Sequence, residues 1–278
     1  MAQNLRLLQR RIRTAKNIAQ IAKAFEMLSA SKIKRAQTAV SNNKPYAQRI
    51  NTLTLDILRH ANLDKFTHPY LAHKETGKTL LIVISPDKGL CGSLNTYLFK
   101  KILEYDNKNV KYYTLGRKAE KFCSRLSGEL IGGNKLGTSI PSYLLVYKLV
   151  EAINTEFVNG DVSKVEILYT QFNSIFSQEP VLKQVLPLNI QHEEGDLLPY
   201  LFEPKAEELL TDLLPYFLEV TLYNSLLEAF TAEQAARMVA MQNAKNNALD
   251  IADYLNLSYN KSRQEKITNE LLALSNNV

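Results

Sequence analysis

Few residues in this chain have the types and spacing that could do chemistry, and the best candidate is the loop Asp87 to Ser93, DKGLCGS. It follows an apolar segment and precedes a helical pattern, where a phosphate could bind the backbone amides of a helix N-terminus. The loop lacks the full G-x-G-x-x-G spacing, and tight packing between strand and helix is an alternative reason for its two glycines. We therefore favour a structural role over a phosphate site.

The other motifs that could carry catalysis fail on their context. Gly77-Lys78-Thr79 imitates the end of a P-loop but precedes a strand, whereas a P-loop follows one. Cys91 and Cys123 form no C-x-x-C pair, so we expect reduced thiols, and no apolar run is long enough to span a membrane. The four histidines show no metal-ligand spacing; they are His60, His68, His73 and His192. The sequence therefore predicts no catalytic residue, no cofactor and no metal site.

The middle of the chain alternates strand and helix patterns. We expect strands at 79–85, 110–115, 164–172 and 180–186, and helices at 94–107, at 142–157 and from Gly116 to Arg125. Glycines 128, 132, 133 and 137 predict a loose connection. Strands that alternate with helices imply a largely parallel sheet covered on both faces.

The two ends of the chain contain no glycine, because all ten glycines lie between Gly77 and Gly195. The last 63 residues also lack proline. Glycine costs a helix interior about 1 kcal/mol and proline about 3 kcal/mol, so the composition predicts a long helix at each end. A 63-residue helix would be on the order of 95 Å long and would need another helix or a partner protein to cover its apolar positions. We expect Pro45 and Pro215 to kink or end these helices.

Apolar residues at both ends follow helical spacing. The expected N-terminal seam is Leu5, Leu8, Ile12, Ala15, Ala19 and Ala22, beside a stripe of Ile18, Ile21, Phe25 and Leu28. The expected C-terminal seam is Met241, Ala244, Ala248, Ile251 and Leu255, resumed at Ile267, Leu271 and Leu274. Alanines allow two helices to approach closely, and a spacing that averages 3.5 residues implies a left-handed supercoil.

Charge is distributed unevenly between the two ends. Residues 1 to 50 carry eleven Lys and Arg against one acid, whereas residues 196 to 278 carry six against twelve. We interpret these as helices that attract each other. The alternative is a coiled-coil scaffold that binds nucleic acid through the basic N-terminal helix, but few aromatic residues are interleaved with the charges.

Six segments together resemble the gamma subunit of the F-type rotary ATP synthase, and the similarity runs from end to end. They are KAFEM (23–27), ASK (30–32), DKGLCG (87–92), SLLE (225–228), EQAARM (233–238) and LSYNKSRQ (257–264). The family is a rotor subunit, not catalytic by itself, of the proton-transporting two-sector ATPase. The resemblance implies an antiparallel coiled coil of N- and C-terminal helices with an inserted Rossmann-like α/β domain, divided as 1–61, 62–204 and 205–278.

The resemblance also implies partners and contact residues. The expected partners are the alpha, beta and epsilon subunits and the membrane ring of c subunits, with no nucleic acid and no small-molecule substrate. The implied beta-subunit and torque contacts are Lys23, Phe25, Arg263, Gln264, Thr268 and Glu270. The implied contacts to the membrane ring and epsilon are Tyr200, Phe202 and Glu203.

Some positions depart from the family pattern. Phe25 stands where many relatives have methionine, Ser93 where a third glycine is common, and Pro86 and Pro215 are further departures. The cysteine insertion of chloroplast relatives is absent, and the chain starts at Met1 without a presequence. The expected location is therefore the cytoplasmic face of a bacterial inner membrane, as a peripheral protein.

Overall fold

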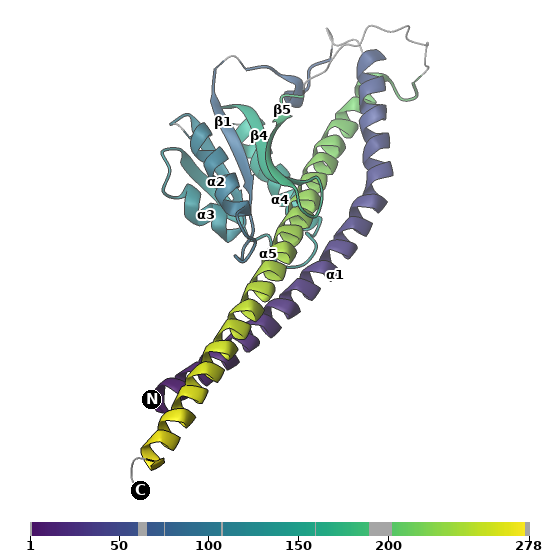
Figure 1. Ribbon diagram of the computed structural model, residues 1–278. Helices are drawn as coiled ribbons and strands as arrows, with labels where there is room; N and C mark the ends of the chain where they lie inside the picture. Colours follow the sequence, from purple (N-terminus) through teal and green to yellow (C-terminus); the bar gives the residue numbers. More distant parts are fainter. Residues whose placement is uncertain are drawn as a thin grey trace. The chain divides into compact units, whose positions relative to one another are not determined.

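Two long helices begin and end the chain, and a sheet with its own helices comes between them (Figure 1). The computed structural model describes residues 2–60, 66–74, 76–106, 108–158, 160–188 and 202–275. The N-terminal helix α1 is Ala2–His60 and the C-terminal helix α5 is Ala206–Ser275. The expected combination of long terminal helices and an inserted α/β region is confirmed.

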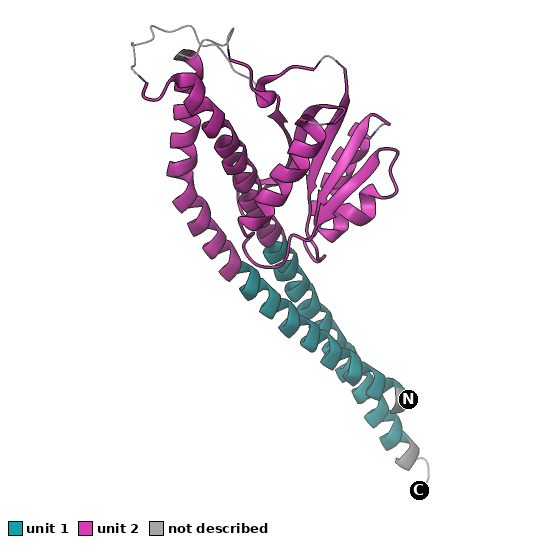
Figure 2. Ribbon diagram, turned by 180° about the vertical axis from the view of Figure 1, so that it is seen from behind, with its two compact units in different colours: residues 1–30, 237–278 teal, residues 31–236 magenta. Residues whose placement is uncertain are grey.

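The contacts divide the chain into two compact units, shown in different colours in Figure 2. We call residues 1–30 and 237–278 the helix-pair unit, and residues 31–236 the α/β unit. Both α1 and α5 contribute to each unit. The three-part division at residues 61 and 204 follows the order of elements along the chain and stays a prediction.

The α/β unit is built on a five-stranded sheet with the order β3-β2-β1-β4-β5. Its strands are β1 (Lys78–Ile84), β2 (Val110–Leu115), β3 (Glu129–Asn134), β4 (Val162–Phe172) and β5 (Gln178–Leu186). The first four strands are parallel, and β5 pairs with β4 in the antiparallel sense. The expected largely parallel sheet is confirmed.

Helices cover both faces of this sheet. Successive side chains of the central strand β1 point to opposite faces, so this strand contributes to a separate core on each face. Leu81 and Val83 of β1 pack with α2 (Leu94–Tyr105) and α3 (Arg117–Cys123). Leu80 and Ile82 pack in a second core with α4 (Leu144–Ile153) and part of α5. From α5, this second core receives Leu210, Leu214, Leu218, Leu222 and Leu226. The segment of α5 from Ala206 to Ala236 thus belongs to the α/β unit, and the rest of the helix belongs to the helix-pair unit.

The glycines at 132 and 133 lie in a strand, so the expected loose connection is wrong. They belong to β3, which pairs with β2 through Tyr113 and Thr114. A Cβ at Gly132 would lie 3.1 Å from the Tyr113 ring. Glycine lowers strand propensity, but the parallel ladder with β2 and the close approach of its side chains explain the strand.

Neither expected proline ends its helix: Pro45 lies inside α1 and Pro215 lies inside α5. A proline in a helix interior costs about 3 kcal/mol, which burial on both sides of it can offset. On α5, Leu214 and Leu218 flank Pro215 and are fully buried. Whether the prolines kink their helices stays a prediction.

Other differences are small. The expected helix at 142–157 is α4 followed by a π-helical turn, Asn154–Val158. Lys74 donates hydrogen bonds to the carbonyl of Phe157 in this turn and to the carbonyls of Gly160 and Val162 after it. The expected helix at 94–107 ends at Tyr105, and the one after Gly116 ends at Cys123. A short 3-10 turn, Pro69–Leu71, precedes β1.

Candidate functional site

The helix-pair unit consists of two antiparallel helices that share a narrow seam of small residues. Tyr259 of α5 accepts a hydrogen bond from Gln9 of α1 at 2.8 Å, and Lys245 lies 2.8 Å from Glu26, so the two sequences run in opposite directions. The buried seam residues are Ile12, Ala15, Ala19 and Ala22 on α1 and Met241, Ala248 and Ala252 on α5. Five of these seven are alanine, which lets the helix backbones approach closely.

Three expected seam positions are wrong, because Ile251, Ile267 and Leu271 are exposed. Ile251 is 55% exposed and Ala252 is buried in its place. An α-helix has 3.6 residues per turn, whereas alternating steps of three and four average 3.5 residues. Positions chosen at that spacing therefore drift around the helix. The seam steps from Ala248 to Ala252 and leaves the larger isoleucine outside. The tip residues Leu271 and Leu272 are also exposed, and the side chain of Leu274 lies outside the described residues.

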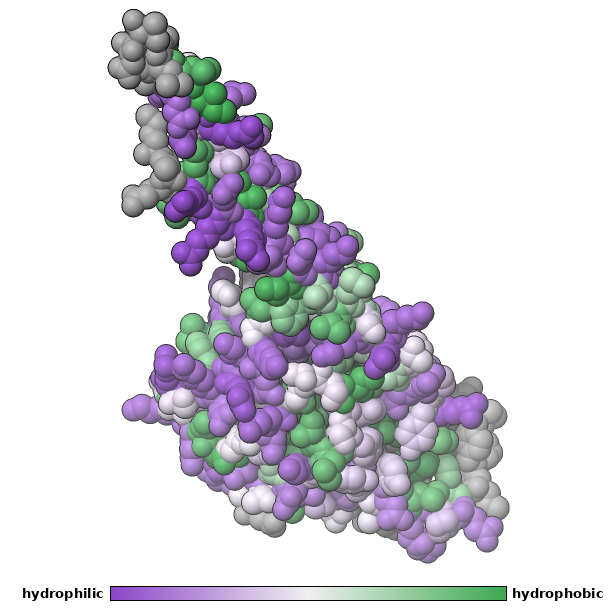
Figure 3. Space-filling view, turned by 90° about the horizontal axis from the view of Figure 1, so that it is seen from below, coloured by the Kyte–Doolittle hydropathy of each residue, from purple (hydrophilic) through white to green (hydrophobic). Residues whose placement is uncertain are grey.

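The outward surface of the helix pair bears many large apolar side chains among its charges, as Figure 3 shows on one face. Isolated exposed leucines are ordinary, but a large exposed apolar surface marks a site that contacts another molecule. The residues involved are Leu7, Ile18, Ile21, Phe25, Met27 and Leu28 on α1, and Leu249, Ile251, Tyr254, Leu257, Ile267, Leu271 and Leu272 on α5. We call this set the apolar surface of the helix pair.

The expected torque residues lie in two separate places on this surface. Lys23 and Phe25 are exposed on α1, and both lie between the seam residue Ala22 and Glu26, which forms the ion pair. Arg263 is exposed on α5, beyond Tyr259. Lys245 pairs with Glu26, so a rise of 1.5 Å per residue places Arg263 about 25 Å along the helix from the Lys23 level. The structure does not bring Lys23 and Arg263 together.

The remaining members of that set extend from Arg263 toward the end of α5. Gln264, Thr268 and Glu270 are exposed, and Glu270 lies 3.5 Å from Lys266 in an i,i+4 ion pair. Exposed pairs of this kind contribute a few tenths of a kcal/mol at most. These side chains are therefore available at the surface of α5 and are not needed to hold the helix pair together.

The expected ring and epsilon contacts precede α5. Phe202 is half-buried against the core of the α/β unit, and Glu203 beside it is exposed. Tyr200 lies outside the described residues. Phe202 is therefore anchored on the core of the α/β unit, whereas the side chain of Glu203 is exposed.

The DKGLCGS loop is tied into the fold. The carboxylate of Asp87 accepts hydrogen bonds from the backbone amides of Arg117, at 2.9 Å, and Gly137, at 2.7 Å. It therefore occupies the N-terminus of α3 as a phosphate would. Cys91 is buried, and its Sγ accepts a hydrogen bond from Asn95 at 3.3 Å. The geometry supports the structural role that we favoured.

Tight packing does not explain both glycines of this loop, however. A Cβ at Gly89 would meet no atom within 4 Å, so that expectation is wrong for Gly89. Gly92 has a φ of 58°, in the left-handed region that favours glycine. This backbone conformation accounts for a glycine at position 92.

The described residues form neither a metal site nor a membrane-spanning helix. No group of three His, Cys, Asp or Glu side chains has the arrangement of a metal site there. In the same part of the chain, no helix combines the length and apolar composition required to cross a bilayer. Lys78, from the P-loop-like tripeptide Gly77-Lys78-Thr79, is the first residue of β1, so the tripeptide precedes a strand as its context predicted. Its ammonium lies 3.5 Å from the carboxylates of both Glu129 and Asp161.

Comparisons with known proteins cover nearly the whole chain. A family model described as ATP synthase matches residues 4–275. The ATP synthase gamma chain of Dehalococcoides mccartyi is 38% identical over 97% of this chain and 96% of that protein. The gamma chain of Methylacidiphilum infernorum is 32% identical, with the same coverage of both chains.

A solved structure has the same fold. A chain of the Euglena gracilis mitochondrial ATP synthase, from a structure of OSCP, F1 and the c-ring in rotational state 3, aligns with a TM-score of 0.71 and 21% identity. The alignment covers 99% of this chain and 93% of that one. With the family model matched along the whole helix pair and α/β unit, and relatives above 30% identity at almost full length, the chain belongs to the ATP synthase gamma-chain family.

Proposed function

We propose that this chain is the central rotor subunit of an ATP synthase, which couples proton flow through a membrane ring to conformational change at the catalytic beta subunits, for ATP synthesis or hydrolysis. The apolar surface of the helix pair carries the proposal, because thirteen large side chains among its described residues stay exposed beside a narrow alanine seam. A surface of this kind is expected to contact another protein, and not solvent, while the subunit rotates. Family membership over the full length supports the same function.

The proposed partners are the alpha, beta and epsilon subunits and the ring of c subunits. The Euglena gracilis protein was solved with OSCP, F1 and the c-ring, which supports this assignment. The chain would itself be non-catalytic and would act from the cytoplasmic face of a bacterial inner membrane as a peripheral protein. The bacterial relatives support that location.

The mechanism is mechanical. Rotation presents different faces of the helix pair to each beta subunit in turn, and a face changes a catalytic site only by binding its open and closed states differently. Exposed apolar side chains such as Leu271 and Leu272 suit this task, because their contacts are non-directional and break at little cost on each turn. The proposed beta contacts are Lys23, Phe25, Arg263, Gln264, Thr268 and Glu270.

Association with the complex is the first test. An affinity tag placed in the exposed β4–β5 turn at residues 173–177 leaves the helix pair unmodified. Recovery of alpha, beta and epsilon subunits with ATPase activity from native membranes is the expected result. Isolation of the chain alone from intact membranes would overturn the proposal.

Coupling by Lys23 and Arg263 is tested in the assembled complex. Lys23→Gln with Arg263→Gln should lower the number of protons pumped per ATP hydrolysed in membrane vesicles. Lys100→Gln, at an exposed lysine of α2, is the matched control and should leave this ratio unchanged. An unchanged ratio in the double variant would remove both residues from the proposed torque contacts.

Contact with the ring is proposed for Phe202 and Glu203, together with Tyr200. Glu203→Lys reverses an exposed charge, so it should lower recovery of the c subunits and epsilon in the same pull-down while alpha and beta are retained. Equal recovery of the ring would contradict this assignment.

No observation favours the nucleic-acid alternative. The basic N-terminal helix shares its unit with α5, and two of its arginines, Arg10 and Arg11, line an apolar groove with Leu7 and Ile18. The family membership accounts for the same residues.

A further inference from the structure

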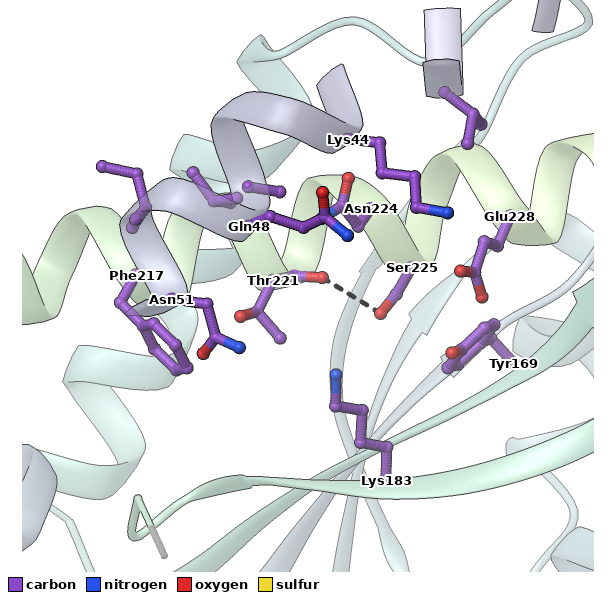
Figure 4. Close-up of a pocket in the computed structure, with 14 residues that line it drawn as sticks. Lys44, Gln48, Asn51, Tyr169, Lys183, Phe217, Thr221, Asn224, Ser225 and Glu228 are labelled. Atoms are coloured by element: carbon purple, nitrogen blue, oxygen red, sulfur yellow. Dashed lines mark hydrogen bonds between the residues drawn. The ribbon is translucent and has the colours of Figure 1, made fainter. Parts of the chain in front are cut away.

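The α/β unit contains a polar cavity of about 360 Å³ that no part of the proposed rotor function uses. Figure 4 shows that its walls come from α1, from α5 and from the strands β4 and β5. Its volume falls in the range of roughly 300–1,000 Å³ that is usual for small-molecule sites. Asn43 of α1 donates a hydrogen bond to Asn224 of α5 at 2.6 Å, which joins the two helices at this position.

Two lysines reach this cavity from opposite walls. Lys44 comes from α1 and Lys183 from β5, and Figure 4 shows Lys183 extending from the strand toward the helices and Lys44 extending beside α5. Among the described residues, no carboxylate lies within 4.0 Å of either ammonium group. The cavity therefore holds two positive charges that no described acidic side chain pairs.

A carboxylate stands at one end of the same cavity. Glu228 of α5 lies beside Tyr169, whose side chain is buried (Figure 4). Burial and the charge and hydrogen bond of Glu228 raise the pKa of Tyr169, so this hydroxyl stays a donor to the carboxylate. The other oxygen, Oε2, is excluded from solvent and has no hydrogen-bond partner among the described residues. The carboxylate therefore closes one end of the cavity, and this oxygen is not open to a ligand.

Further polar groups line the space between these charges. Gln48 and Asn51 lie one turn apart on α1 and reach the cavity with their amides, which can donate and accept. Ser225 of α5 donates its hydroxyl proton to the carbonyl of Thr221 at 3.1 Å, which leaves its oxygen able to accept. Phe217 provides an apolar wall.

We propose that this cavity binds a small metabolite that carries a phosphate group together with a hydroxyl or amino group. The phosphate would lie between Lys44 and Lys183, because a phosphate monoester carries close to two negative charges at neutral pH and two ammonium groups match them. The hydroxyl or amino group would lie against the amides of Gln48 and Asn51, which can accept or donate. A simple carboxylate would leave one of the two lysines unmatched.

Binding would act on the packing of the two helices. Because α1, α5 and β5 each contribute a wall, a bound molecule stabilises the arrangement in which all three are close, by mass action. The ligand would therefore be a regulator of this chain and not a substrate. This inference does not depend on the proposed rotor function and would hold for the isolated chain.

Direct binding to the purified full-length chain tests the proposal. Ribose 5-phosphate and AMP are the probes, unphosphorylated ribose is the control, and calorimetry and thermal unfolding are the readouts. Both phosphorylated probes should bind at one site per chain and raise the unfolding temperature, whereas ribose should do neither. Absence of saturable binding by both phosphorylated probes at millimolar concentration would overturn the proposal.

Variants locate the site. Lys183→Met and Lys44→Met remove one positive charge each from exposed positions, so the variants should fold and bind the probes at least about tenfold more weakly. Lys100→Met, at an exposed lysine outside the cavity, should bind like the wild type. Gln48→Leu should weaken AMP and ribose 5-phosphate binding but not abolish it. Wild-type affinity in both cavity lysine variants would show that the molecule binds elsewhere and overturn the assignment.

Discussion

Glu26 of α1 and Lys245 of α5 face each other across the helix pair, with carboxylate and ammonium 2.8 Å apart and both side chains half-buried. Glu26 is the single acidic residue among the first 50, and Lys245 is one of six basic residues after residue 195. The pair therefore has the opposite polarity to the net charges of the two ends. Specific positions, and not average charge, define this contact.

Glu26→Gln should lower the free energy of unfolding by about 1 kcal/mol, because it leaves a half-buried ammonium without its anion. The effect should shrink in high salt. Urea unfolding of the full chain at low and high ionic strength measures both. Glu270→Gln, which breaks the exposed pair with Lys266, is the control and should cost a few tenths of a kcal/mol. Equal losses in the two variants would contradict the role of Glu26.

Leu218→Ala should destabilise the α/β unit by about 2–5 kcal/mol, because it opens a cavity under a helix that packs on the sheet. Leu218 is fully buried, whereas Tyr216, two residues before it on α5, is 54% exposed. Tyr216→Ala should therefore cost less than about 1 kcal/mol. Urea unfolding followed by circular dichroism gives both values. A small loss at Leu218 would mean that α5 is not part of this core.

Gly116→Ala should destabilise the chain by several kcal/mol or prevent its folding. Gly116 has a φ of 102°, and a Cβ there would collide with the backbone carbonyl of Ser85. Gly89→Ala is the control in the neighbouring loop, where an added Cβ meets nothing within 4 Å. It should stay within about 0.5 kcal/mol of wild type. Thermal unfolding and soluble yield would test the pair, and similar behaviour of both variants would refute the explanation.

Tyr112→Phe should make the free energy of unfolding fall less steeply as the pH rises above about 10. Burial, and then the hydrogen bond and charge of Asp106, raise the pKa of Tyr112 above its ordinary value of 10.0. Below pH 10 both states hold the proton and the stabilisation is fully present. As the pH rises through 10 toward the pKa of Tyr112 in the folded state, the unfolded state loses this proton first, so the free energy of unfolding falls.

The size of that effect is set by one proton. Tyr112 is fully buried, so its removal should reduce the slope of stability against pH above 10 by up to about 1.4 kcal/mol per pH unit. Urea unfolding at pH 8, 9, 10 and 10.5 measures the slope. Tyr97→Phe, at a tyrosine that is more than half exposed, should leave it as in wild type. An unaltered slope in Tyr112→Phe would refute the assignment.

Much of the architecture could be predicted from local patterns. Glycine exclusion indicated both long helices, a continuous apolar run indicated β1, and alternation of strand and helix indicated a mainly parallel sheet. The seam residues Ile12, Ala15, Ala19 and Ala22 followed from spacing alone. These features depend on residues close together in the chain, and the short motifs from Lys23 to Gln264 carried the resemblance to the family.

What sequence patterns missed depends on contacts between distant residues. Gly132 and Gly133 disfavour a strand, and only the ladder with β2 makes them part of one. Likewise Pro215 disfavours a helix, and only burial of Leu214 and Leu218 on the sheet keeps α5 continuous. Local propensity was outweighed by packing in both cases.

The sequence by itself therefore determined the helices, the alternating middle and the family, because periodicity and composition act within a few turns of chain. Only the tertiary structure decided that Asp87 occupies the start of α3, that Ala252 and not Ile251 fills the seam, and that Lys44, Lys183 and Glu228 line one cavity. Lys44 and Glu228 are 184 positions apart in the sequence. Folding alone brings such residues together, since no periodic pattern extends over that distance.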